Sequence, residues 1–159
     1  MFSRDTCEMI ELLHRCSVNY MIVGGYAAIY HGYVRFTADV DFFYEAEEEN
    51  CKRLFRALQD FWDGSIPLVE NYKELMVKGQ VLQFGMPPNR LDFINEIEGV
   101  SFRECQDHLI VDTILCNQKE LKANFISLNQ LIKNKKAAGR PKDLIDADYL
   151  ERVRKSSGQ

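Results

Sequence analysis

Three aspartates in apolar segments are the residues of this chain best suited to chemistry. Asp39 and Asp41 stand two residues apart in a strand predicted over 38–44. Because side chains alternate along a strand, both face one side of the sheet, while the apolar Val40 and Phe42 face the other. Two carboxylates about 4 Å apart repel by roughly 4 kcal/mol at an effective dielectric constant near 20. A cation between them removes that cost, and oxygen ligands at this spacing favour Mg²⁺, with Mn²⁺ as the alternative.

Asp92 is a third acid in the same kind of setting. It lies between Leu91 and Phe93 in a strand predicted over 90–94, so it faces away from these two apolar side chains. A carboxylate in such a place needs a partner. The partner is either a cation shared with the other aspartates or the side chain of Arg90, and the second case would be a simple surface ion pair.

A glycine pair precedes the aspartates. Gly24-Gly25 follows an apolar strand predicted over 20–23 and precedes a short helix predicted over 26–31. Glycines at this point let the backbone approach a ligand and direct free N–H groups at a phosphate. An isolated Gly-Gly is more often a plain tight turn, and an isolated D-x-D is often an exposed strand end. The prediction of a site therefore depends on the combination of the glycine pair with the aspartates.

The elements that must position these residues follow from periodicity and capping signals. Ser127 is suited to cap a helix, Gly139 to end it, and Pro141 to begin the next. Residues 69–76 are ambiguous. The remaining expected elements are helices over 3–16, 47–62, 101–108, 127–138 and 141–154, and strands over 77–84, 109–116 and 121–126, the last two joined about Asn117-Gln118.

This order predicts an α/β (α+β) fold with a small mixed β-sheet flanked by helices and followed by C-terminal helices. The length of 159 residues predicts one domain over 1–159, with a core over 18–126 and a helical segment over 127–155. The chain has neither a P-loop lysine motif nor a G-x-G-x-x-G fingerprint, so these two phosphate-binding motifs are excluded.

Composition narrows the classes of protein. With 46% hydrophobic and 28% charged residues, the chain is typical of a globular protein. No apolar run approaches the roughly 20 residues that a bilayer requires, and no signal peptide is apparent, so we expect a cytoplasmic protein without a membrane partner. The five cysteines form no C-x-x-C pair, which predicts reduced thiols and no zinc ribbon.

Charge is distributed unevenly along the chain. Residues 1–118 carry 10 basic and 19 acidic residues, whereas residues 119–159 carry 10 basic and 5 acidic residues. The two segments are either solvated faces that attract each other or the cation-binding and phosphate-binding walls of one cleft. Charge alone does not decide between these interpretations.

The glycine pair, a spacer and the D-x-D motif together resemble the signature of the polymerase-beta-like nucleotidyltransferase superfamily, and Thr37 matches its common T-x-D position. A second segment, Lys135 to Asp146, resembles the K-x-A-A-G-R-x-K-D-x-x-D helix pair of small bacterial nucleotidyltransferases, including those of the abortive-infection toxin type. The resemblance extends over about residues 18–150.

The resemblance implies a role for each matching residue. One or two Mg²⁺ ions would be held by Asp39, Asp41 and Asp92, and Asp92 would also accept the proton of the acceptor. The nucleotide would be bound by Gly24, Gly25, Thr37, Lys135, Arg140, Lys142 and Asp143. Asp143 and Asp146 would orient the cations or the nucleotide.

The resemblance also implies an activity. The protein would move a nucleoside monophosphate from a nucleoside triphosphate to a hydroxyl of a tRNA or other RNA, a protein or a small molecule, with release of pyrophosphate. No further domain for recognising the acceptor is apparent, so a second copy of the chain or an antitoxin protein is an expected partner.

Two alternatives remain open at this point. One is a binding module with this fold that lacks catalysis, for example one component of a toxin–antitoxin pair, although an intact set of acids argues against it. The other is a nucleic-acid-binding regulator, which the overall acidity disfavours. The aromatic residues between the motifs either stack on a base or pack in the core and its rim: Tyr26, Tyr30, His31, Tyr33 and Phe36.

Overall fold

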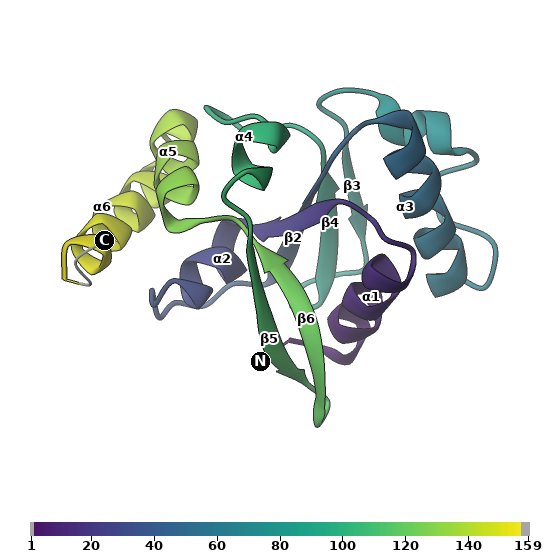
Figure 1. The fold of residues 1–159 in the computed structure, drawn as a ribbon, viewed down its shortest axis with the longest axis horizontal. Helices are drawn as coiled ribbons and strands as arrows, with labels where there is room; N and C mark the ends of the chain where they lie inside the picture. The colour runs from purple at the N-terminus through teal and green to yellow at the C-terminus, as the bar shows by residue number, and fades with distance from the viewer. Residues whose placement is uncertain (1, 157–159) are drawn as a thin grey trace.

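The sheet is the element on which the rest of the chain is assembled. In the computed structural model, which describes residues 2–156, six strands form one mixed sheet in the order β3-β4-β2-β1-β6-β5. The strands are β1 (Tyr20–Val23), β2 (Asp39–Tyr44), β3 (Val81–Phe84), β4 (Arg90–Ile94), β5 (Ile110–Cys116) and β6 (Lys119–Phe125). The predicted α+β class is confirmed (Figure 1).

Helices cover both faces of this sheet (Figure 1). They are α1 (Arg4–Arg15), α2 (Gly24–Tyr30), α3 (Glu48–Phe61), α4 (Phe102–Gln106), α5 (Leu128–Ala138) and α6 (Pro141–Ser156), with a 3₁₀ helix η1 (Tyr72–Met76). On one face, α1 and α3 pack against Phe42 and Phe93. On the other face, α2, α4, α5 and α6 surround Met21 and Phe43. None of the helices described is long and apolar enough to cross a bilayer.

The strand pairing decides which polar side chains meet. β2 and β4 are parallel neighbours, and their register sets Asp41 beside Asp92 and Asp39 beside Arg90. Alternation along β2 buries Val40 on the α1–α3 face, so the two aspartates lie on the opposite face. The sheet therefore gathers three carboxylates on the face that α2 and α5 cover.

Most predicted elements lie within a few residues of their expected bounds, and two differences have clear causes. The strand expected over 77–84 begins only at Val81, because residues 77–80 form a turn in which the Gly79 N–H donates to Asn95 Oδ1 at 2.9 Å. The ambiguous stretch contains η1, which begins with a capping box between Asn71 and Glu74.

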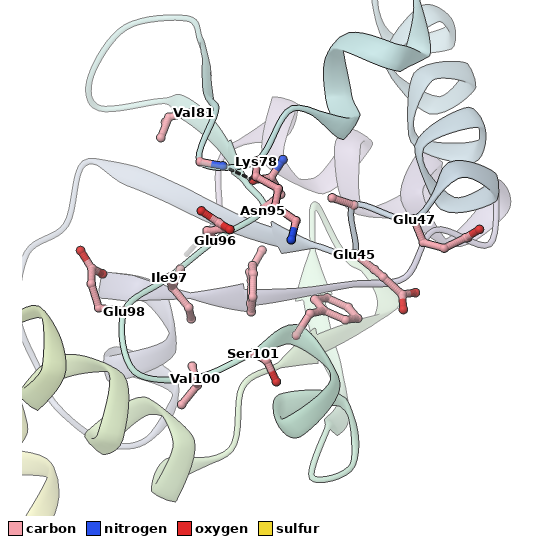
Figure 2. Close-up of a pocket in the computed structure, with 14 residues that line it drawn as sticks. Glu45, Glu47, Lys78, Val81, Asn95, Glu96, Ile97, Glu98, Val100 and Ser101 are labelled. Atoms are coloured by element: carbon pink, nitrogen blue, oxygen red, sulfur yellow. Dashed lines mark hydrogen bonds between the residues drawn. The ribbon is translucent and has the colours of Figure 1, made fainter.

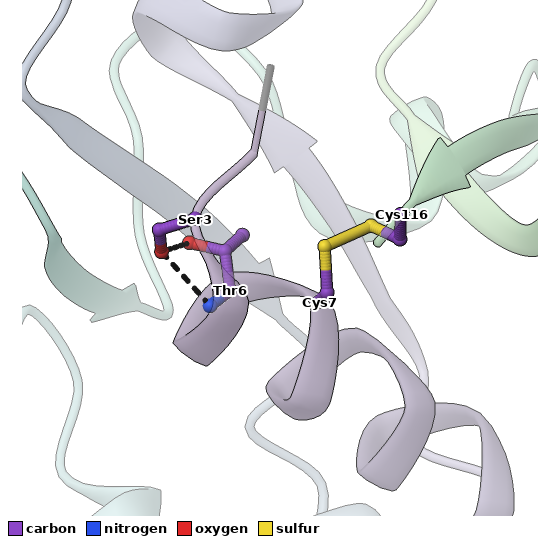
Figure 3. The surroundings of a disulfide bond; sticks show 4 residues. All are labelled: Ser3, Thr6, Cys7 and Cys116. Carbon is purple, nitrogen blue, oxygen red and sulfur yellow. Dashed lines mark hydrogen bonds between the residues drawn. A yellow bond between two sulfur atoms is a disulfide. The ribbon is translucent and has the colours of Figure 1, made fainter. Parts of the chain in front are cut away.

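The prediction that all the cysteines are free thiols is wrong. A disulfide joins Cys7 on α1 to Cys116 at the end of β5, whereas Cys16, Cys51 and Cys105 are free (Figure 3). The two bonded residues are 109 positions apart, so their meeting depends on how the β5–β6 hairpin lies along α1, which no local spacing reveals. The cysteine-based argument for a reducing compartment is therefore removed.

The disulfide gives a prediction about thiol content. Iodoacetamide is expected to label three cysteines of the denatured, unreduced protein and five after reduction, as counted by mass spectrometry. Because the bond closes a long loop, Cys7→Ser should lower the free energy of unfolding by about 2–4 kcal/mol. Cys16→Ser, at a free and partly buried position, is the control. Five labels without reductant would contradict the pairing.

Candidate functional site

Ten of the eleven residues that the sequence analysis assigns a role line one pocket of about 430 Å³, called here the carboxylate pocket, and Asp146 is not among its lining residues. They come from the first motif (Gly24, Gly25, Thr37, Asp39 and Asp41), from β4 (Asp92) and from the helix pair (Lys135, Arg140, Lys142 and Asp143). The two walls that the uneven charge distribution suggested therefore belong to one cavity, with the three aspartates on the strands and the cations on α5, α6 and their connection.

Arg90 holds two of the three aspartates. Its Nη2 donates to Asp39 Oδ2 at 2.7 Å, and its Nε and Nη2 donate to the two oxygens of Asp92 at 2.7 and 2.9 Å. Gln83 donates a further hydrogen bond to Asp92 at 3.1 Å. Arg90 is therefore the partner of Asp92, as one of the two alternatives expected. Because Asp92 is only 5% exposed, the pair is not a simple surface contact.

Asp41 is left without this support. It is half-buried and no hydrogen bond to its side chain occurs within residues 2–156, while Asp39 Oδ1 is buried and also has no partner there. Burial, and then the charge of Asp92, raise the pKa of Asp41 to about 6, although Lys135 and Arg90 act in the opposite direction. One guanidinium among three carboxylates leaves excess negative charge, which is concentrated at Asp41.

These oxygens suit a divalent cation by their chemistry. The two oxygens of Asp41 and Oδ1 of Asp39 are hard donors without a protein partner in the described chain, which is the condition under which a carboxylate accepts Mg²⁺. As the side chains lie, no three His, Cys, Asp or Glu residues of the described part are grouped closely enough to enclose a metal ion. Arg90 forms ion pairs with both Asp39 and Asp92 in this arrangement.

The glycine pair makes room for side chains of the protein itself. Gly24 has φ +62°, and a Cβ at this position would collide with Asp41 Oδ2. A Cβ on Gly25 would collide with Thr37 Oγ1 and lie 2.7 Å from Arg35 Nη2. The packing of the carboxylate pocket therefore favours glycine at both positions independently of any ligand, because a Cβ there would displace the side chains of Asp41, Thr37 or Arg35.

The helix pair forms as its capping residues predict. The Ser127 side chain accepts from the Gln130 N–H, and Gly139 has φ +66° at the C-terminus of α5. Lys135 is 6% exposed, and its Nζ lies 2.7 Å from Asp143 Oδ1 and 3.0 Å from Asp146 Oδ2. The side chain predicted to neutralise phosphate thus ties α5 to α6.

The other two cations that the helix pair contributes to the pocket, Arg140 and Lys142, differ in whether they have an ion-pair partner. Arg140 is exposed and donates from Nε to Asp143 Oδ2 at 2.5 Å. Burial alone would raise the pKa of Asp143, but the hydrogen bonds from Lys135 and Arg140 hold it below its ordinary value. Lys142 is exposed at the rim of the carboxylate pocket and has no ion-pair partner among the described residues.

Four polar residues that the sequence analysis missed also line the carboxylate pocket: Arg35, Glu96, Glu98 and Asn134. Arg35 had a usable signal, because it lies two and four residues before Thr37 and Asp39, in the period-two series that the aspartates continue. Glu96 and Glu98 follow β4 in an irregular segment, and no local pattern places them.

The aromatic residues between the motifs mostly pack on the protein. Tyr30 stacks on Phe125 with ring centroids 4.0 Å apart, and Tyr33 stacks on Tyr149 at 4.2 Å. None of the five lines the carboxylate pocket as described. Only Phe36 is strongly exposed among them, at 81%. Of the two interpretations, packing in the core and its rim is therefore the one that applies to Tyr30 and Tyr33.

No protein-family model matches this chain, and no curated protein matches it. The geometry and chemistry of the carboxylate pocket therefore carry the functional argument.

The raised pKa of Asp41 gives a prediction about stability without metal. A carboxyl group that titrates near 6 when folded and near 3.8 when unfolded binds its proton more tightly in the folded state. Stability in EDTA should therefore fall as the pH rises from about 4 to about 6 and change little above that range. Asp41→Asn should remove this dependence and raise the free energy of unfolding at pH 8 by roughly 1–3 kcal/mol.

Urea titrations of wild type, Asp41→Asn and the exposed control Asp107→Asn across this pH range measure the effect. Equal pH dependence in all three proteins would show that Asp41 titrates normally.

The buried position of Lys135 gives a second prediction. Lys135→Met should lower the free energy of unfolding by about 3–5 kcal/mol, because it leaves Asp143 and Asp146 buried without their main cation. Lys136→Met changes the neighbouring lysine, whose pair with Glu151 is exposed, and should cost less than about 1 kcal/mol. Comparable losses in the two variants, measured by denaturant unfolding, would contradict the internal role of Lys135.

Proposed function

We propose that the protein is a Mg²⁺-dependent nucleotidyltransferase that moves a nucleoside monophosphate from a nucleoside triphosphate to a hydroxyl acceptor. The observation that carries the proposal is the carboxylate of Asp41, which has no hydrogen bond or ion pair within the described residues, in a cavity that also contains cationic side chains. A triphosphate with its cation needs both kinds of wall within a few ångströms. A structural ion-pair cluster would instead leave no carboxylate without a partner.

In this proposal each wall has a defined task. Asp41 and Asp39 would hold the cation through the oxygens that lack partners, and Asp92 would support them on the adjacent strand. When bound, Mg²⁺ supplies charge neutralisation on the phosphates and lowers the pKa of the acceptor hydroxyl. Lys142 and Arg140 at the rim of the pocket would offset phosphate charge. Asp92 already accepts three hydrogen bonds, which favours a supporting role over that of proton acceptor.

The neighbouring cavity bears on the acceptor. A pocket of about 810 Å³, called here the acid-lined pocket, shares Glu96 and Glu98 with the carboxylate pocket and continues to Glu45 and Glu47 (Figure 2). Lys78 is the single basic residue among those that line it in the described chain. This negative potential repels a nucleic-acid backbone. Among the acceptors considered, it favours a protein or a small molecule over RNA at this entrance.

Calorimetric titration tests the proposal with each of the four common nucleoside triphosphates, in Mg²⁺ and in EDTA. Wild type should bind at least one of them only when Mg²⁺ is present. Asp41→Asn should weaken that binding by more than about tenfold, because it removes a direct ligand of the cation. The same variant is expected to be more stable, so the loss cannot be attributed to unfolding. Asp107→Asn serves as the control.

Two results would count against the proposal. Unchanged nucleotide binding by Asp41→Asn would remove the carboxylate pocket from consideration. Failure of wild type to bind any triphosphate would favour a non-catalytic module that binds a protein, such as a toxin–antitoxin component.

A further inference from the structure

We propose that Arg35 is an anion-binding residue of the carboxylate pocket and takes a phosphate group of the nucleotide. This inference rests on the proposed function and adds to it a residue that neither motif contains. Arg35 lies in the segment between α2 and β2, and its side chain lines the carboxylate pocket beside Gly25 and Thr37.

The guanidinium of Arg35 is short of partners. Its side chain is 13% exposed, and no hydrogen bond to it occurs within residues 2–156. Nε is buried without an acceptor, and the recorded carboxylate contact, from Nη2 to Asp146 Oδ2, is 3.6 Å long. An arginine carries five N–H donors and never loses its charge, so a largely buried guanidinium in this state is unfavourable unless a ligand completes it.

The guanidinium of Arg35 lies at the carboxylate pocket. Arg35 Nη2 would lie 2.7 Å from a Cβ built on Gly25, so the guanidinium lies directly against the backbone there. Gly25 and Asp41 line the same cavity of about 430 Å³. An anion held by a cation at Asp41 would therefore share this cavity with the guanidinium of Arg35.

Two other cations at the pocket already have close carboxylate partners, whereas Lys142 is exposed at its rim. Arg90 is bound to Asp39 and Asp92, and Lys135 is bound to Asp143 and Asp146. The contact of Arg35 with Asp146 Oδ2 is long, and Lys135 Nζ lies closer to the same oxygen, at 3.0 Å. Arg35 therefore keeps N–H donors that no hydrogen bond in the described chain uses, and its planar fork matches two oxygens of one phosphate group.

Titrations with inorganic tripolyphosphate, inorganic phosphate and the preferred nucleoside triphosphate, all in Mg²⁺, test the inference by calorimetry. Arg35→Gln should weaken tripolyphosphate and nucleotide binding by at least about tenfold, because it removes a charge-assisted contact. Arg35→Lys keeps the charge and the approach to Asp146 but lacks the fork, so it should weaken both several-fold and keep a wild-type melting temperature.

Arg53→Gln is the matched control. Arg53 is also partly buried with an unpartnered Nε, but it lies on α3, away from the carboxylate pocket. Its substitution should leave both affinities unchanged.

Each outcome separates this inference from the proposed function. If wild type binds nucleotide and the two Arg35 variants bind it equally well, the inference is overturned and the proposed function stands. If wild type binds neither tripolyphosphate nor nucleotide, the inference about Arg35 and the proposed function are both wrong. If inorganic phosphate binds as tightly as the longer anions, the residue serves a free-phosphate site and the assignment to a nucleotide is wrong.

Discussion

The negative charge gathered by the β2–β4 register is the constraint around which the pocket is built. Parallel pairing sets Asp41 directly beside Asp92, and β2 alternation adds Asp39 on the same face. Arg90, placed beside Asp39 by the same register, neutralises part of this charge. Gly24 must lack a side chain because Asp41 occupies the space where a Cβ would lie. Each of these features follows from keeping three carboxylates on one face of the sheet.

The C-terminal helices supply cations on the other side of the cavity from these carboxylates. The ion pairs of Lys135 with Asp143 and Asp146 fix α5 against α6, and the charge of Lys135 acts on Asp41. A buried ion network of this kind adds little net stability compared with apolar packing, but it holds its members in one geometry when every charge has a partner. The network therefore gives the helices a defined position relative to the strands, at the cost of desolvating the buried charges.

Local patterns predicted what depends on neighbours in sequence. The alternation of β2, the serine and glycine caps of α5 and the turn at Asn117-Gln118 could all be read directly, because each is decided within a few residues. The three aspartates and the glycine pair were predicted as site residues for the same reason, whereas Thr37 and the residues of the helix pair were assigned from the resemblance. Contacts between distant segments could not be predicted in this way. The burial of Lys135 requires α6 to fold back over α5, and the disulfide requires Cys116 to meet α1. Arg35 continues the period-two series of the aspartates, but it lies before the strand predicted over 38–44 and was missed for that reason.

The arrangement of charge gives the proposed reaction a direction. Lys135, Arg140 and Lys142 lie at the α5–α6 side of the carboxylate pocket, and beside Gly25 lies the guanidinium of Arg35, whose Nε is buried without a hydrogen-bond partner. The acid-lined pocket shares Glu96 and Glu98 with this cavity, and the charged residues that line it in the described chain are acidic except for Lys78. A triphosphate is attracted to the first region and repelled from the second, so its phosphates would lie toward Arg35 and Lys142. An acceptor without phosphates would then reach the reacting phosphorus from the acidic side, where it does not compete with the nucleotide for the same charges.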